Sequence, residues 1–216
     1  MSLKLYFGPG ACSFVPHAML QMSGAEFEPE MIKLHKNEQG GDAFLALNPR
    51  AQVPVLVHDD MVLDQLVAIV LYLDDLLPDA GILPGSGPAR TKALQTLMWM
   101  NNTVHPTFTH IFMPFKYTDN EAAQAELRRF NTALFQQRLG EIDALCAALP
   151  DAGWLSGDKP GALDAYALTF LRWGSIAKID PTQFKSLWAL ANRFYDLPAV
   201  KPVIERERLQ LNLMAA

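Results

Sequence analysis

The strongest constraint on the fold is a change of pattern partway along the chain. Before residue 78, short apolar runs typical of strands alternate with helical runs, and after residue 87 every long periodic segment is helical. Residues 78–87 read Pro-Asp-Ala-Gly-Ile-Leu-Pro-Gly-Ser-Gly, which is typical of a linker. We therefore predict an α/β domain at residues 1–77, a linker at 78–87 and an all-helical domain at 88–216.

The first domain is expected to have the order β-α-β-α-β-β-α, with a parallel pair of strands followed by a hairpin. The expected strands are Leu3–Phe7, Glu28–Leu34, Val53–Val57 and Met61–Leu63. The expected helices are Phe14–Met22, a short turn at Asp42–Leu47, and Val67–Leu77.

The second domain is expected to contain only helices. The segments are Ala89–Val104 and Phe108–Phe115 (one long helix strained around Pro106 and Pro114), Glu121–Leu149, Leu163–Lys178, Thr182–Tyr195 and Ala199–Leu211. The segment from residue 163 to 178 is apolar on nearly every face, which predicts a buried central helix. Asp164, the charged group at its start, is expected to accept hydrogen bonds from exposed N–H groups and so to serve folding.

Charge and hydropathy exclude several classes of function. The net charge is −5 and no basic stripe exists, so nucleic-acid binding is not expected. The longest uninterrupted apolar run, Leu66 to Leu73, is too short to span a bilayer, and the N-terminus has no secretory apolar region. Cys12 and Cys146 match neither a metal-ligand nor a disulfide pattern. These features favour a cytoplasmic protein without a metal or a membrane partner.

Cys12 is the residue most suited to chemistry. It lies between an expected strand and an expected helix, where unpaired N–H groups and the helix dipole favour a thiolate. The alternative is that Cys12 is a small buried apolar residue. Val15 stands where a second cysteine of a redox dithiol would be, so two-thiol exchange is excluded, although a mixed disulfide remains possible.

Four motifs in order give the chain a family resemblance. They are Tyr6-Phe7-Gly8-Pro9-Gly10-Ala11-Cys12-Ser13 with Pro16-His17; Asn48-Pro49-Arg50-Ala51-Gln52-Val53-Pro54-Val55-Leu56; Val67-Ala68-Ile69 with Tyr72-Leu73; and Gly157-Asp158 with Asp164-Ala165-Tyr166. Together they resemble a cytosolic glutathione transferase of the bacterial, cysteine-type beta class. The resemblance implies a thioredoxin-like first domain, a glutathione transferase C-terminal domain and a homodimer.

The resemblance also implies where glutathione binds. Cys12 would interact with the glutathione sulfur, and His105 of the helical domain would approach the same place. Pro54 would follow a cis peptide bond, so that the backbone of Val53, next to Gln52, pairs with the peptide-like ligand. The alternatives are that Pro54 only ends a loop and that His105 is structural.

At the γ-glutamyl end the chain departs from the family pattern. The pair Gln65-Leu66 stands where the family has an acidic residue or glutamine and then usually serine. Leu66 keeps the backbone N–H that can bind a carboxylate at a helix N-terminus, but it has no hydroxyl. Lys36, with His35, could contact the glycine carboxylate of glutathione, and a solvated surface is the alternative for that loop.

The function expected from this resemblance is transfer of the glutathione thiolate to small hydrophobic electrophiles, as in detoxification. The electrophile would lie between the domains, where four apolar side chains could form a wall or merely pack: Phe108, Phe112, Met113 and Phe115. Two other functions remain open. One is a non-catalytic ligand-binding protein on the same fold, and the other is a glutathione-dependent thiol reductase or isomerase that uses Cys12.

Overall fold

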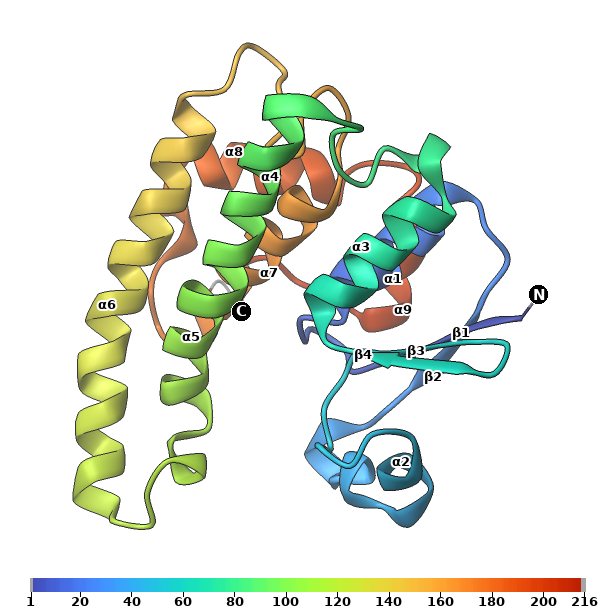
Figure 1. Cartoon of the computed structure of the whole chain (residues 1–216). Helices are drawn as coiled ribbons and strands as arrows, with labels where there is room; N and C mark the ends of the chain where they lie inside the picture. Colours follow the sequence, from blue (N-terminus) through green and yellow to red (C-terminus); the bar gives the residue numbers. More distant parts are fainter. Residues whose placement is uncertain (1, 215–216) are drawn as a thin grey trace.

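A computed structural model of the chain describes residues 2–214, and Figure 1 labels its elements. The first part forms a four-stranded sheet in the order β2-β1-β3-β4. The strands are β1 (Leu3–Phe7), β2 (Glu28–Met31), β3 (Val55–His58) and β4 (Met61–Asp64). β1 and β2 are parallel, whereas β3 is antiparallel to both β1 and β4, so the predicted parallel pair and hairpin are confirmed.

Helices cover both faces of this sheet. α1 (Phe14–Ser23) and α3 (Leu66–Leu76) pack together on one face, and α2 (Asp42–Leu47) lies on the other (Figure 1). A small apolar cluster joins α2 to the sheet, and the main core lies on the side of α1 and α3. The predicted β-α-β-α-β-β-α order is therefore confirmed.

The second part of the chain is helical. Its helices are α4 (Gly87–Trp99), α5 (His105–Phe112), α6 (Glu121–Ala147), α7 (Ala162–Ile176), α8 (Lys185–Tyr195) and α9 (Lys201–Glu207). As predicted, α7 is central, and all of its residues except Arg172 and Ile176 are buried. α1 packs against α7 and α9, which brings the loop before α1 next to the helical part. Within residues 2–214 no helix has both the length and the apolar character to cross a membrane.

The start of α7 is held by Asp164, as predicted. Its carboxylate accepts hydrogen bonds from the N–H groups of Leu155, Ser156 and Gly161 at 2.8, 3.3 and 2.9 Å. Gly161, the residue before the helix, has no side-chain oxygen to complete a capping box. The hydroxyl of Ser156 supplies one instead, because it accepts the N–H of Leu163 at 3.0 Å.

The second strand is shorter than expected. β2 ends at Met31, and residues 34–40 form two short 3₁₀ turns, Leu34–Lys36 and Glu38–Gly40. The carboxylate of Glu38 accepts the N–H of Lys33 at 2.7 Å, which bends the chain away from the sheet.

Two helices end three or four residues earlier than expected. The long helix ends at Phe112, because Pro114 disfavours the helical conformation at Met113, whose φ and ψ are −130° and 53°. The last helix ends at Glu207, where Arg208 takes a left-handed conformation with φ 52°. Residues 208–214 are not helical but still contribute to the core, since Leu209 and Leu211 are buried.

Candidate functional site

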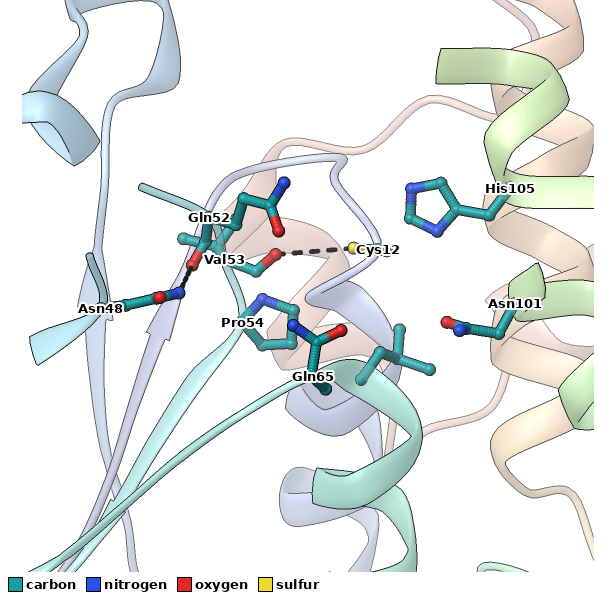
Figure 2. Close-up of a pocket in the computed structure, with 9 residues that line it drawn as sticks. Cys12, Asn48, Gln52, Val53, Pro54, Gln65, Asn101 and His105 are labelled. Carbon is teal, nitrogen blue, oxygen red and sulfur yellow. Dashed lines mark hydrogen bonds between the residues drawn. The ribbon is translucent and has the colours of Figure 1, made fainter. Parts of the chain in front are cut away.

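One pocket lies between the sheet and the helical part, and it contains most of the residues that the sequence singled out (Figure 2). Its lining consists of Cys12, Asn48, Gln52, Val53, Pro54, Gln65, Leu66, Asn101 and His105. Lys36 is not part of the lining; it lies exposed on the first 3₁₀ turn. None of the lining side chains is a carboxylate or a lysine or arginine. Among residues 2–214 no group of three or more His, Cys, Asp or Glu side chains is arranged to hold a metal ion.

Cys12 is positioned by a tight turn between β1 and α1. The hydroxyl of Ser13 accepts the N–H of Gly8 at 3.0 Å, and Ala11 N–H donates to the Gly8 carbonyl at 3.0 Å. Gly10 has φ 70°, a left-handed conformation that glycine adopts at little cost. A Cβ at this position would also require the guanidinium of Arg172 to move.

The helical part holds this turn from the other side. The Gly10 N–H donates to the carboxylate of Glu207 at 2.8 Å, and the Gly10 carbonyl accepts the indole N–H of Trp173 at 2.9 Å. The second Glu207 oxygen lies 2.7 Å from Nδ1 of His17, and neither side chain is exposed. Arg206 approaches the other nitrogen of His17 at 3.1 Å. These anchors were not predicted, because Glu207 is 197 residues from Gly10 in the sequence.

The expectation that Cys12 is a thiolate is wrong for this structure. Burial raises the pKa of the Cys12 thiol to about 12, and the charge of Glu207 adds to this. The backbone N–H groups of Cys12 and Ser13 lower the pKa, as the helix-end argument requires, but desolvation outweighs them. The thiol Sγ lies 3.7 Å from the carbonyl oxygen of Val53, to which it donates (Figure 2). Cys12 is therefore a neutral thiol at neutral pH.

The segment opposite Cys12 is held by Asn48. Its side-chain amide donates to the carbonyl of Gln52 at 2.8 Å (Figure 2), and its side-chain oxygen accepts the N–H of Arg50 at 3.0 Å. The peptide bond between Val53 and Pro54 is cis, so this expectation is confirmed. Asn48 is the first residue of one of the motifs that carried the resemblance. The sequence did not predict that its side chain is buried, at 2% exposure.

At the third side of the pocket, Gln65 and Leu66 form the start of α3. Gln65 has φ 72° and ψ 116°, and Leu66 is the first residue of the helix. The Leu66 side chain is 5% exposed and belongs to the main core. Its backbone N–H therefore stands at the positive end of the α3 dipole without a hydroxyl beside it.

His105 reaches the pocket from the long helix, which has a local irregularity there. Between α4 and α5, residues Met100–Val104 form a π-helical turn, and the His105 N–H bonds to the Met100 carbonyl. Pro106 has no N–H to continue the α-helical pattern, and the Thr107 hydroxyl donates to the Thr103 carbonyl at 2.8 Å. This turn separates the two halves of the predicted long helix and presents both Asn101 and His105 to the pocket.

His105 is a neutral imidazole in this setting. Its Nδ1 lies 2.7 Å from the hydroxyl of Tyr166, and its ring packs edge-on against Trp173 at 4.9 Å. Burial lowers the pKa of His105 to about 4. A neutral imidazole has one donor and one acceptor nitrogen, so it can offer a hydrogen bond or take a proton.

The four apolar side chains expected around the electrophile lie outside this pocket lining. Phe108 is buried and stacks on Trp173 at 4.5 Å and on Phe112 at 5.6 Å. Phe112 and Phe115 are 54% and 58% exposed. Their role toward a second substrate stays a prediction.

Both parts of the chain match models of known families. Residues 1–75 match the glutathione S-transferase N-terminal domain, and residues 100–198 match the glutathione S-transferase C-terminal domain. The chain therefore belongs to the glutathione S-transferase family.

Bacterial members of the family resemble this chain over nearly its whole length. Glutathione S-transferase GstA of Escherichia coli O157:H7 is 31% identical over 211 residues, covering 96% of this chain and all of that protein. A bacterial beta-class glutathione S-transferase from Sphingomonas chungbukensis has 30% identity and a TM-score of 0.79 over 96% of this chain and all of that one. The resemblance to the beta class is thus confirmed.

Two further relatives are a glutathione complex and an isomerase. A sphingomonad glutathione S-transferase solved in complex with glutathione has 29% identity and a TM-score of 0.80, covering 96% of this chain and all of that one. A maleylpyruvate isomerase from Ralstonia sp. is 26% identical over 190 residues, 87% of this chain and 90% of that protein.

Proposed function

We propose that the protein binds glutathione in the pocket at Cys12 and transfers its thiolate to a small hydrophobic electrophile. The observation that carries the proposal is the arrangement of the neutral Cys12 thiol, the cis peptide bond before Pro54 and the neutral His105 around one pocket. Membership of the glutathione S-transferase family supports the same activity.

In this reaction the glutathione thiolate attacks an electrophilic carbon. A sulfur–carbon bond forms with the sulfur electron pair, and the leaving group departs with the pair of the bond that breaks. The S–H of Cys12 and an N–H of His105 would stabilise the bound thiolate, and the pocket would hold it near the electrophile. The Val53 backbone would pair with the peptide part of glutathione, beside Gln52 and cis-Pro54.

The state of Cys12 favours transfer over chemistry in which Cys12 itself reacts. A reductase that forms a mixed disulfide needs a Cys12 thiolate as nucleophile, and a pKa of about 12 leaves little of it at neutral pH. An isomerase that uses glutathione as its nucleophile would not need this thiolate, and the maleylpyruvate isomerase among the relatives keeps that candidate open.

The first experiment is calorimetric titration with glutathione, followed by a conjugation assay with 1-chloro-2,4-dinitrobenzene. We expect submillimolar binding and measurable conjugation, and no binding at 10 mM glutathione would refute the proposal and favour a ligand-binding protein. Cys12→Ala should keep part of the conjugation activity. Complete loss of activity in this variant would favour a reaction through Cys12 itself.

Three further expectations belong to this proposal. Lys36 would contact the glycine carboxylate, and unchanged glutathione affinity in Lys36→Ala would exclude this. The protein would be cytoplasmic and would form a homodimer; the exposed apolar side chains of Met98 on α4 and Phe130 on α6 support the dimer. Light scattering should then give twice the 24.0 kDa monomer mass, and a monomer mass would rule out the dimer. The domains would divide at residues 78–87.

A further inference from the structure

The hydroxyl of Tyr166 lies next to the pocket without lining it. Tyr166 is on the central helix α7, it is fully buried, and its ring stacks on Phe170 at 4.2 Å. Its hydroxyl oxygen is 2.7 Å from Nδ1 of His105 and 3.5 Å from the side-chain oxygen of Asn101. Asn101 lies in the π-helical turn and His105 directly follows it, and both line the pocket.

The single proton of the Tyr166 hydroxyl can go to only one of these two partners. A phenol is a stronger acid than the N–H of a neutral imidazole, and an imidazole nitrogen is a stronger base than a phenol oxygen. The distance to His105 is that of a good hydrogen bond, whereas 3.5 Å to Asn101 is at the limit of one. The hydroxyl therefore donates to Nδ1 of His105.

This bond decides where the proton of His105 resides. Nδ1 of His105 accepts, so the one proton of the neutral ring must be on Nε2. Burial, which lowers the pKa of His105 to about 4, keeps the ring neutral in the physiological range. In Figure 2 the His105 ring lies across the pocket from Cys12, and both residues line the pocket. A sulfur bound between them would be within reach of the Nε2–H.

We propose that Tyr166 is a positioning residue, which fixes His105 as the Nε2–H tautomer and makes it a hydrogen-bond donor to the sulfur in the pocket. The role at the sulfur rests on the proposed function, whereas the tautomer itself does not. His105 in this state stabilises a thiolate by donating a hydrogen bond and does not act as a base that removes the thiol proton.

The first test is the ¹⁵N spectrum of the His105 ring at pH 7.5, assigned by comparison with His105→Gln. The wild type should show a protonated Nε2 and an unprotonated Nδ1, and Tyr166→Phe should shift the ring toward a mixture of tautomers. Tyr72→Phe is the matched control, because it removes a hydroxyl that contacts His58, a histidine outside the pocket. A proton on Nδ1 in the wild type, or an unchanged spectrum in Tyr166→Phe, would overturn the proposal.

The second test asks whether Tyr166 acts through His105. Tyr166→Phe should lower kcat/KM for conjugation about tenfold in the wild-type background and have no further effect in His105→Gln. An equal loss in both backgrounds would mean that the hydroxyl only supports the structure, and would refute the positioning role. The spectrum needs no substrate, so absent conjugation in the wild type would refute the proposed function and leave the tautomer assignment to be judged by the spectrum.

Discussion

Replacing Leu66 by serine should strengthen glutathione binding while weakening the fold. Leu66 is the first residue of α3, at the pocket wall, so a serine hydroxyl there would stand beside the helix N-terminus where a carboxylate can bind. A hydrogen bond to a charged group contributes about 1.5–3 kcal/mol, which corresponds to a roughly ten- to hundredfold lower Kd. We expect the lower end, because the existing N–H and dipole already act on the same carboxylate.

The same substitution should cost stability. The Leu66 side chain is 5% exposed and packs in the main core. Truncating a buried leucine lowers the unfolding free energy by about 2–5 kcal/mol. For Leu66 the loss should be about 2 kcal/mol, because the pocket lets water reach the vacated space. For a chain of this size that lowers Tm by about 4–8 °C.

Leu66→Ala is the control that separates the two effects. It removes the same apolar bulk without adding a hydroxyl, so its loss of Tm should be similar to that of Leu66→Ser. Calorimetric titration of both variants with glutathione then isolates the hydroxyl, and we expect Leu66→Ser to bind at least tenfold more tightly than Leu66→Ala. Equal affinities would refute the reasoning, because the carboxylate would then not bind at the α3 N-terminus.

Four further predictions follow from the buried groups. At pH 8, iodoacetamide should alkylate Cys12 about a thousandfold more slowly than a free cysteine, and the rate should rise about tenfold per pH unit. The alkylation rate is measured by mass spectrometry, and a rate that levels off near pH 8 would contradict the raised pKa of Cys12. His105 has a pKa of about 4 in the folded chain and 6.5 in the unfolded chain, so protonation at low pH favours the unfolded chain. Between pH 7 and pH 4 the wild type should therefore lose about 3 kcal/mol more unfolding free energy than His105→Gln, as measured by urea titration. An equal loss in the two proteins would exclude the lowered pKa of His105. Asp164→Ala leaves three N–H groups without their acceptor and should lower the unfolding free energy by about 3–5 kcal/mol in urea titration; less than about 1 kcal/mol would show that water replaces the carboxylate. Glu207→Ala should cost a similar amount, about 3–5 kcal/mol, because it leaves the buried Nδ1 of His17 and the N–H of Gly10 without their carboxylate; a stability equal to wild type would contradict the role of these buried hydrogen bonds.

The sequence predicted the features that depend on neighbours along the chain. The strand before Cys12 and the helix after it, which stops at Gly24, follow from local pattern and from the geometry of glycine. The cis bond at Pro54 and the approach of His105 came from the resemblance, which carries tertiary information that local pattern lacks.

The sequence did not predict the protonation state of Cys12, because that depends on distant parts of the chain. The helix-end argument gave the correct sign for the local N–H groups, yet burial beneath the helical part and the charge of Glu207 reverse the outcome. Asn101 was missed because none of the motifs included it, although it lies four residues before His105, a spacing that places two side chains on the same face of a helix.

The raised pKa of Cys12 and the lowered pKa of His105 have the same cause, because burial disfavours the charged form of each group. The pocket is therefore lined by a neutral thiol and a neutral imidazole rather than by a thiolate–imidazolium pair. A Cys12 thiolate would repel an incoming glutathione thiolate. A His105 imidazolium would form an ion pair with the Cys12 thiolate and would not be free to bind the glutathione sulfur. Two neutral donors form no ion pair that must first be broken, so the S–H of Cys12 can exchange its weak hydrogen bond to the Val53 carbonyl for one to the bound sulfur, beside the N–H of His105. The burial that makes Cys12 a poor nucleophile thus makes the site better suited to hold the thiolate of another molecule.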